Sequence, residues 1–110
     1  MLKNLRTHQL ALQFYQTTRS RKLPNGLKAQ LGRAASSVAL NLAEGYGRKT
    51  APDRLHFFHM ALGSIRECQS ITQLERNNFT NSEIALLDRL AASTYLLIKN
   101  HPLAPKPPAS

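Results

Sequence analysis

The chain has little cysteine, few acidic residues and no long run of apolar residues. A single cysteine, Cys68, excludes an internal disulfide framework and a cysteine-rich zinc site. No apolar run approaches the roughly 20 residues that a membrane helix needs, and the start of the chain lacks the apolar stretch of a secretory signal. We therefore expect a cytoplasmic protein of a reducing, bacterial-type compartment, with no membrane contact.

The scarcity of acidic residues makes the protein strongly basic. Six Asp and Glu stand against fifteen Lys and Arg, so the 110-residue chain has a formal net charge of +9. Residues 1–49 carry +8 of this charge and contain one acidic residue, Glu44, whereas residues 50–110 carry +1. The hydrophobic fraction of 42% is that of a globular domain, so the charge belongs to a folded surface. This asymmetry favours a polyanion or an acidic protein as partner over a basic protein without such a partner.

Apolar residues recur at spacings of three and four in four segments, and no alternating pattern typical of strands competes with them. We therefore predict an all-α, antiparallel up-down-up-down four-helix bundle over residues 1–100. The helices are expected at about residues 3–20, 27–46, 52–76 and 81–99.

The expected helix ends follow from capping residues. Thr50, with Pro52 in the first turn, is predicted to cap the third helix, and Thr80 or Asn81 the fourth. Glu75 and Glu83 are interpreted as ordinary solvated charges. The four prolines of residues 101–110 cannot continue a helix, so we expect a flexible tail rather than a binding segment.

The predicted fourth helix carries two apolar rows. One row is close to a heptad seam and contains Ile84, Leu87, Ala91, Thr94 and Ile98; the second contains Leu86, Leu90 and Leu97. If the second row were exposed, it would form a patch that monomers avoid, which favours a homo-oligomer. A wide stripe facing the core is the alternative.

The sequence offers no catalytic or metal-binding constellation. His56 and His59 share a helix face but lack a third ligand, and Cys68 lies on an apolar stripe without a partner histidine. The segment GYGRKT at residues 45–50 matches only the last letters of a phosphate-binding loop and lacks the preceding strand. We therefore expect no enzyme activity, no metal and no cofactor.

Basic side chains would gather at both ends of an antiparallel bundle. One end collects Lys3, Arg6, Arg48, Lys49 and Arg54, with Tyr46 available to stack on a base; the other collects Arg19, Arg21, Lys22 and Lys28. Such side chains bind the nucleic-acid backbone without reading its sequence. The pattern predicts binding to RNA or DNA.

Polar residues also line one face of the second helix, at Gln30, Arg33, Ser37, Asn41, Glu44 and Arg48. This stripe is either a solvated face or a polar seam against another helix. The neighbouring small side chains would let a helix approach closely, which would bring Arg33 and Glu44 near Arg66 or Glu67.

The stripe belongs to a pattern that resembles a known family. The segments QLGRAASSV (30–38), NLAEG (41–45) and GSIRE (63–67) are similar to the four-helix bundle protein family, also called the 23S ribosomal RNA intervening-sequence protein family. The resemblance covers about residues 3–100 and implies a cytoplasmic four-helix bundle without known catalysis. It also implies similarity to the accessory variability determinant of diversity-generating retroelements, a basic, barrel-like pentamer that binds a reverse transcriptase and nucleic acid.

By this resemblance, the motif positions mark family identity and assembly, and none is catalytic: they are Gln30, Arg33, Ala34, Ser37, Asn41, Glu44, Gly45, Gly63, Ser64 and Glu67. Gly32 stands where many members have a second basic residue, which weakens any claim that this spot grips phosphate. Together, sequence and resemblance predict a non-enzymatic homo-oligomer, a pentamer by the resemblance, that binds nucleic acid. The alternative is an adaptor that docks an acidic or polymerase-like protein.

Overall fold

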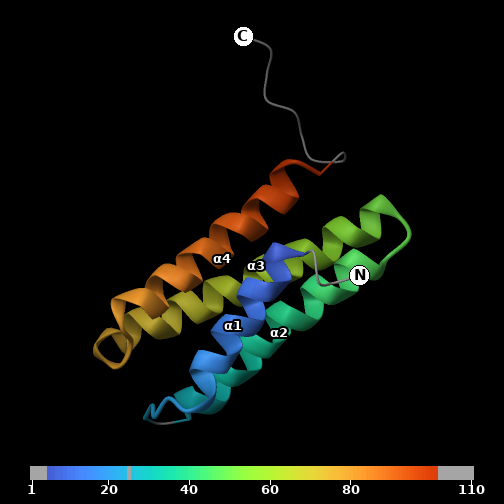
Figure 1. Cartoon of the computed structure of the whole chain (residues 1–110). Helices are drawn as coiled ribbons and strands as arrows, with labels where there is room; N and C mark the ends of the chain where they lie inside the picture. The colour runs from blue at the N-terminus through green and yellow to red at the C-terminus, as the bar shows by residue number, and fades with distance from the viewer. Residues whose placement is uncertain (1–4, 25, 102–110) are drawn as a thin grey trace.

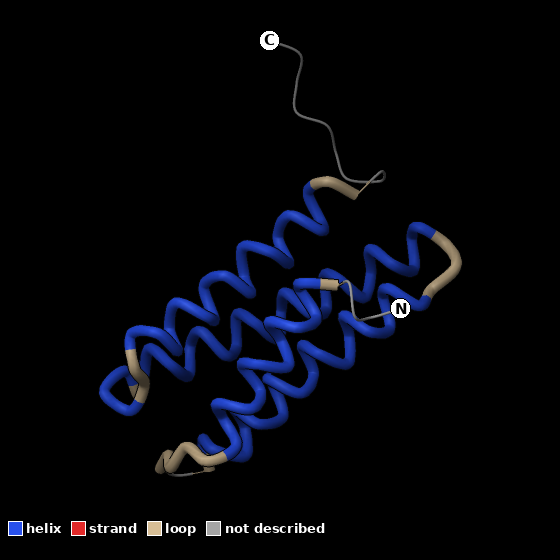
Figure 2. Tube along the Cα trace, viewed as in Figure 1, coloured by secondary structure: helices blue, strands red, loops and turns tan. Residues whose placement is uncertain are grey.

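The protein is an antiparallel bundle of four helices, seen here in a computed structural model that describes residues 5–24 and 26–101. The helices are α1 (Arg6–Arg19), α2 (Leu27–Gly47), α3 (Ala51–Leu74) and α4 (Asn81–Lys99), and a short 3-10 helix, η2 (Arg76–Asn78), joins the last two. Packing follows a closed ring, in which α1 contacts α2 and α4, and α3 contacts α2 and α4 (Figure 1). No strand occurs in the described ranges, and short loops connect successive helices (Figure 2).

Local sequence explains where three of the helices begin. Gly26 precedes α2 with a positive φ of 76°, a conformation that glycine adopts without steric cost. The Thr50 side chain caps α3 by accepting a hydrogen bond from the Asp53 amide, and Pro52 occupies the first turn. A complete capping box starts α4, in which Thr80 and Glu83 each accept from the other's backbone amide.

Two helices have boundaries that differ from those predicted from the apolar periodicity. The third helix ends at Leu74 rather than near residue 76, because residues 76–78 tighten into η2 before the capping box. The first helix begins at Arg6, and the residues before Leu5 lie outside the described part, as does the proline-rich segment from residue 102 onward.

The core is a continuous apolar cluster to which all four helices contribute. Its largest fully buried side chains include Phe14 of α1, Leu42 of α2, Ile65 of α3 and Leu90 of α4. Such burial of apolar area is the main favourable contribution to folding. Within the described ranges, no helix combines the length and apolar character that crossing a membrane requires.

The two apolar rows of α4 both face this core, which corrects the expectation of an exposed second row. Leu86 and Leu90 are buried, and Leu97 packs against the cluster. The reason is that α4 contacts both α1 and α3, so a wide stripe of its surface is covered. These leucines therefore give no support to a homo-oligomer.

Candidate nucleic-acid interface

Tyr46 lies where α2 ends, and its ring takes part in the packing of the bundle. The ring meets that of Phe58 edge-on, with centroids 5.2 Å apart, and a side-chain hydrogen bond links Tyr46 to Thr7. Burial raises the pKa of the Tyr46 hydroxyl, and the hydrogen bond with Thr7 acts in the opposite direction. Only part of the ring is therefore open to a stacking base.

Arg48 follows Tyr46 and makes two intramolecular contacts. Its Nη2 lies 2.9 Å from Oε2 of Glu44, one turn back on the same side of α2. Its guanidinium also lies over the Phe57 ring, 4.7 Å from the centroid. Arg48 and Glu44 are both exposed, so this pair holds the side chain only weakly against a competing phosphate.

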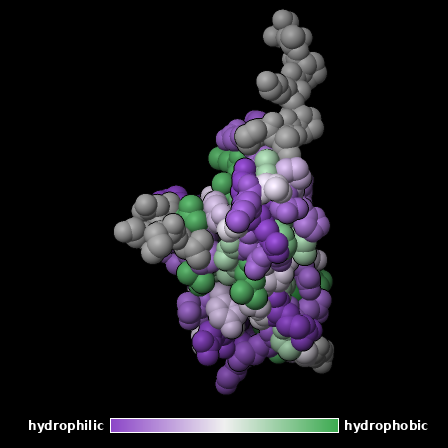
Figure 3. Space-filling view, turned by 90° about the vertical axis from the view of Figure 1, so that its right-hand side faces the viewer, coloured by the Kyte–Doolittle hydropathy of each residue, from purple (hydrophilic) through white to green (hydrophobic). Residues whose placement is uncertain are grey.

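The other cations at this end of the bundle differ in whether their side chains form hydrogen bonds within the protein. Arg54 folds back onto the α2–α3 turn, where its Nη1 donates to the backbone carbonyls of Arg48 and Lys49 at 3.4 and 3.1 Å. Lys49 and Arg6 are exposed, and their side chains have no ion pair or hydrogen bond to another described residue. Lys3 lies outside the described residues. Figure 3 views the molecule from the side of the α2–α3 turn, and this face is mostly hydrophilic with several small hydrophobic patches.

Arg21 has a structural role at the opposite end of the bundle. Its guanidinium forms an ion pair with Glu83 at the start of α4 and lies 5.6 Å from the centroid of the Phe79 ring. The side chains of Arg21 and Glu83 are only 28% and 13% exposed. Glu83 is therefore not the solvated charge that the sequence indicated, and Arg21 is held away from solvent.

Three further cations at this end of the bundle are open to solvent. Arg19 ends α1, Lys22 lies in the α1–α2 loop and Lys28 lies in the first turn of α2. Among the described residues, none of their side chains has an ion pair or hydrogen-bond partner. The described members of the two predicted basic groups thus lie at the two ends of the bundle, and the α1–α2 hairpin links these ends (Figure 1).

The polar stripe of α2 forms a seam against α3. The hydroxyls of Ser37 and Ser64 lie 2.9 Å apart across the two helices. Asn41 donates from Nδ2 to the carbonyl and hydroxyl oxygens of Ser37, at 2.9 and 3.0 Å, and so orients that hydroxyl. Two turns before Ser37 on α2, Gln30 donates to Glu67 of α3 at 3.3 Å. The seam explains why these motif positions are small or able to hydrogen-bond.

Gly45 permits a close approach of α2 to α3. A Cβ atom added at Gly45 would lie 2.6 Å from Cε1 of Phe58 and 3.3 Å from the carbonyl oxygen of Arg54. Gly63, by contrast, is exposed, and no atom would lie within 4 Å of an added Cβ. Packing of the bundle therefore requires glycine at position 45 but not at position 63.

The predicted charge pairs across the seam do not form. Glu44 accepts from Arg48, Glu67 from Gln30, and Arg66 donates to Gln69 on its own helix. Arg33 is exposed, and its side chain has no partner among the described residues. The reason is that the short Ser37 and Ser64 side chains already meet across the seam, so the long charged side chains turn outward or along their own helices.

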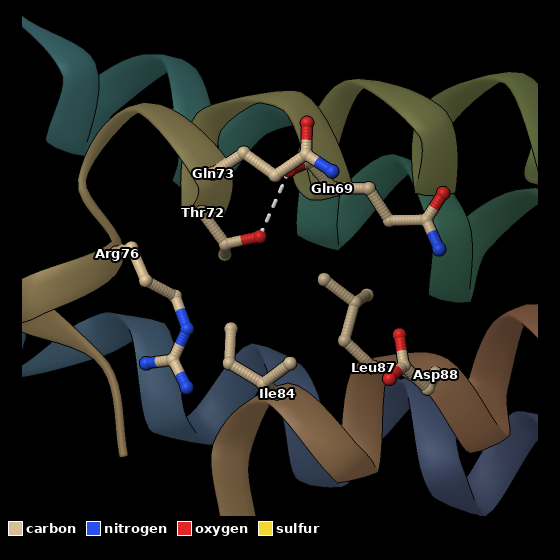
Figure 4. A pocket seen from close by; sticks show the side chains of 7 residues that line it. All are labelled: Gln69, Thr72, Gln73, Arg76, Ile84, Leu87 and Asp88. Atoms are coloured by element: carbon tan, nitrogen blue, oxygen red, sulfur yellow. Dashed lines mark hydrogen bonds between the residues drawn. The ribbon is translucent and has the colours of Figure 1, made fainter. Parts of the chain in front are cut away.

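A hollow of about 380 Å³ lies between the end of α3 and the start of α4 (Figure 4). Ile84 and Leu87 point into it from α4, and the Thr72 hydroxyl donates to the carbonyl oxygen of Gln69. Arg76 at its rim is engaged by the backbone carbonyl of Phe79 and the side chain of Asn81. This hollow therefore offers no free cation to a nucleic acid.

In the described part of the chain, His56, His59 and Cys68 do not form a cluster with other metal-ligating side chains. Among the described residues, no three His, Cys, Asp or Glu side chains lie together as a metal site would need. Cys68 is fully buried, and its burial, helped by the charge of Glu67, raises the pKa of the thiol to about 12. His56 and His59 are exposed on α3.

Sequence reasoning missed the Arg21–Glu83 pair for a physical reason. The spacing of Thr80 and Glu83 is the signature of a capping box, and this signal could have predicted that Glu83 bonds to the start of α4. Arg21 is 62 residues away in the chain, and no local pattern reports such a contact.

Comparison with known proteins identifies the family of the chain. The sequence model of a family described as 23S rRNA-intervening sequence protein matches residues 5–99, a range that includes all four helices. No curated protein and no solved structure matches the chain. The match spans most of the chain, and the chain belongs to the 23S rRNA-intervening sequence protein family.

Proposed function

We propose that the protein is a non-enzymatic, cytoplasmic, homo-oligomeric bundle that binds RNA or DNA through backbone phosphates. The supporting observation is the surface of the α1–α2 hairpin, which presents many cations and one acidic residue, Glu44. Within residues 5–24 and 26–49, which include the hairpin and the start of the α2–α3 turn, six exposed cations have no intramolecular partner among the described residues: Arg6, Arg19, Lys22, Lys28, Arg33 and Lys49.

Because these side chains are spread along the hairpin, they match an extended polyanion better than a single phosphate. Lys and Arg contacts to the backbone fix the position of a strand without reading its sequence. The name of the family, which refers to an rRNA intervening sequence, is compatible with this chemistry.

Mutation of the hairpin tests this proposal. A double variant, Lys22→Ala with Lys28→Ala, is expected to bind a labelled RNA about tenfold more weakly at low salt, uniformly across sequences. The matched control is Arg66→Ala with Arg89→Ala, which removes the same charge from exposed positions of α3 and α4. Equal losses in both double variants would contradict a hairpin interface. Co-purification of an acidic protein that survives nuclease treatment would favour the adaptor function instead.

Self-association is supported by the outer side of the α2–α3 seam. A glycine inside a helix lowers its stability, and no neighbouring atom in the described monomer requires glycine at position 63. Leu40, one turn from Ser37, is 66% exposed, and Met60, one turn from Ser64, is 44% exposed. A second copy packed here would cover both apolar side chains and approach Gly63 closely.

Light scattering of the intact chain tests the assembly. Leu40→Glu is expected to lower the mass to that of a smaller species, whereas Leu74→Glu, at an equally exposed leucine near the end of α3, is expected to leave it unchanged. A wild-type monomer would overturn the proposed assembly, including the pentamer that the family resemblance implies.

A further inference from the structure

A second hollow, of about 410 Å³, opens at the Tyr46 end of the bundle. Its lining residues belong to the first turn of α1, the first half of α3 and the last turns of α4 with the two residues that follow. Its lining is Thr7, Phe58, Ser93, Leu96, Leu97, Asn100 and His101. This volume lies within the range of small-molecule binding sites.

The lining combines an apolar wall with hydrogen-bonding side chains. Phe58 belongs to the core and Leu97 packs against it, and the two side chains supply the apolar wall. The Thr7 hydroxyl is bonded to Ser93 and also to Tyr46, so the Ser93 hydroxyl, which is half-buried, is the one with hydrogen-bonding capacity left for a ligand. The exposed side chain of Asn100 has no partner among the described residues and offers both a donor and an acceptor.

This combination selects a class of ligand. The lining contains no Lys, Arg, Asp or Glu, so it suits neither a phosphate nor a metal ion. A planar heteroaromatic ring with a hydrogen-bonding edge fits both the apolar wall and the amide of Asn100, since an asparagine amide pairs bidentately with a base edge. An unpaired nucleobase has this chemistry, and single strands are recognised in this way.

Two cations that adjoin lining residues in the sequence agree with a base that is attached to a phosphate backbone. Arg6 precedes Thr7 and Lys99 precedes Asn100, and both cations are exposed. We propose that the hollow binds one unpaired nucleobase, while Arg6 and Lys99 contact the adjoining phosphates. This assignment rests on the proposed nucleic-acid binding and adds a preference for unpaired bases over duplex.

One experiment compares two labelled strands by fluorescence anisotropy at about 50 mM salt: a short oligo(dT) and an abasic strand with the same number of phosphates. The intact protein is expected to bind oligo(dT) about tenfold more tightly than the abasic strand, in line with the worth of one bidentate base contact. Asn100→Ala should remove most of this preference without changing affinity for the abasic strand. Asn77→Ala, an exposed asparagine near the opposite end, should leave both affinities unchanged. Equal binding of both strands by the intact protein would overturn the base site but leave backbone binding in place.

A titration with free adenosine and uridine separates the hollow from the proposed function, because nucleosides carry no phosphate. At about 5 mM nucleoside, NMR shifts are expected at Thr7, Ser93 and Asn100 and are expected to be lost in Asn100→Ala. Absence of these shifts would overturn the base site even if strands bind. Shifts without any strand binding would support the base site and overturn the proposed nucleic-acid function.

Discussion

The guanidinium of Arg21 is paired with the carboxylate of Glu83, and the same carboxylate closes the capping box of α4. Glu83 Oε2 accepts from Arg21, while Oε1 accepts from the Thr80 backbone amide. One carboxylate therefore ties the α1–α2 loop to the start of α4. Arg21 was predicted to bind nucleic acid, but its ion pair with Glu83 gives it a structural role instead.

Replacement of Arg21 should lower stability rather than binding. Arg21→Ala leaves the mostly buried Glu83 carboxylate without its partner, so we expect a loss of about 1–2 kcal/mol in the free energy of unfolding. Arg19→Ala, at an exposed neighbour without a partner in the described ranges, should change it by less than about 0.5 kcal/mol. Urea denaturation measures both. The assignment fails if the two variants are equally stable.

Gly45 and Gly32 should respond in opposite directions to alanine. A methyl group at Gly45 collides with the Phe58 ring, and overpacking of this kind costs about 1–3 kcal/mol. At Gly32, inside α2, nothing lies within 4 Å of an added Cβ, so Gly32→Ala should stabilise the helix by up to about 1 kcal/mol. Thermal unfolding of the two variants compares them directly. A stabilised Gly45→Ala variant would contradict the close approach of α2 and α3.

Thr94 is a buried residue whose side-chain hydroxyl is left without a hydrogen bond in the described part of the chain. It is completely buried, and its hydroxyl has no hydrogen-bond partner in the described part of the chain. Thr94→Val keeps the shape and removes the unsatisfied group, so we expect a gain of about 1 kcal/mol. Thr72→Val is the control, because the equally buried Thr72 hydroxyl donates to Gln69 at 3.0 Å. Chemical denaturation should rank the Thr94 variant above the Thr72 variant, and the reverse order would refute this reading.

These positions show how far the sequence predicts the structure. Periodicity and the Thr50 and Thr80 caps predict the four helices, since caps and apolar stripes are local properties. The burial of Leu90 is different, because it depends on α4 lying between two neighbours. The sequence located the cations of the candidate interface but could not separate Arg21, engaged by a residue far along the chain, from the open Lys22.

Cys68 should be a neutral, unreactive thiol in the folded protein. Burial raises its pKa from 9.0 to about 12, so between these values the folded state retains a proton that the unfolded state loses. The stabilising contribution of this residue is complete below about pH 9 and declines as the pH rises above it.

The test is the free energy of unfolding of wild type and Cys68→Ala between about pH 8 and about pH 10. The advantage of the wild type should shrink as the pH rises, and a constant difference would contradict the shifted pKa. Because Cys68 is the chain's single cysteine, its labelling by a thiol reagent should also be slow until the protein unfolds.

We propose that the exposed cations of the α1–α2 hairpin bind nucleic-acid phosphates. The most direct test is the salt dependence of RNA and DNA affinity for the intact protein between about 50 and about 200 mM salt. We predict a linear fall of the logarithm of the binding constant with the logarithm of salt concentration, with a slope of about −0.7 to −0.9 per phosphate neutralised. Affinity that does not change with salt, or no binding at the lowest salt concentration, would contradict the claim.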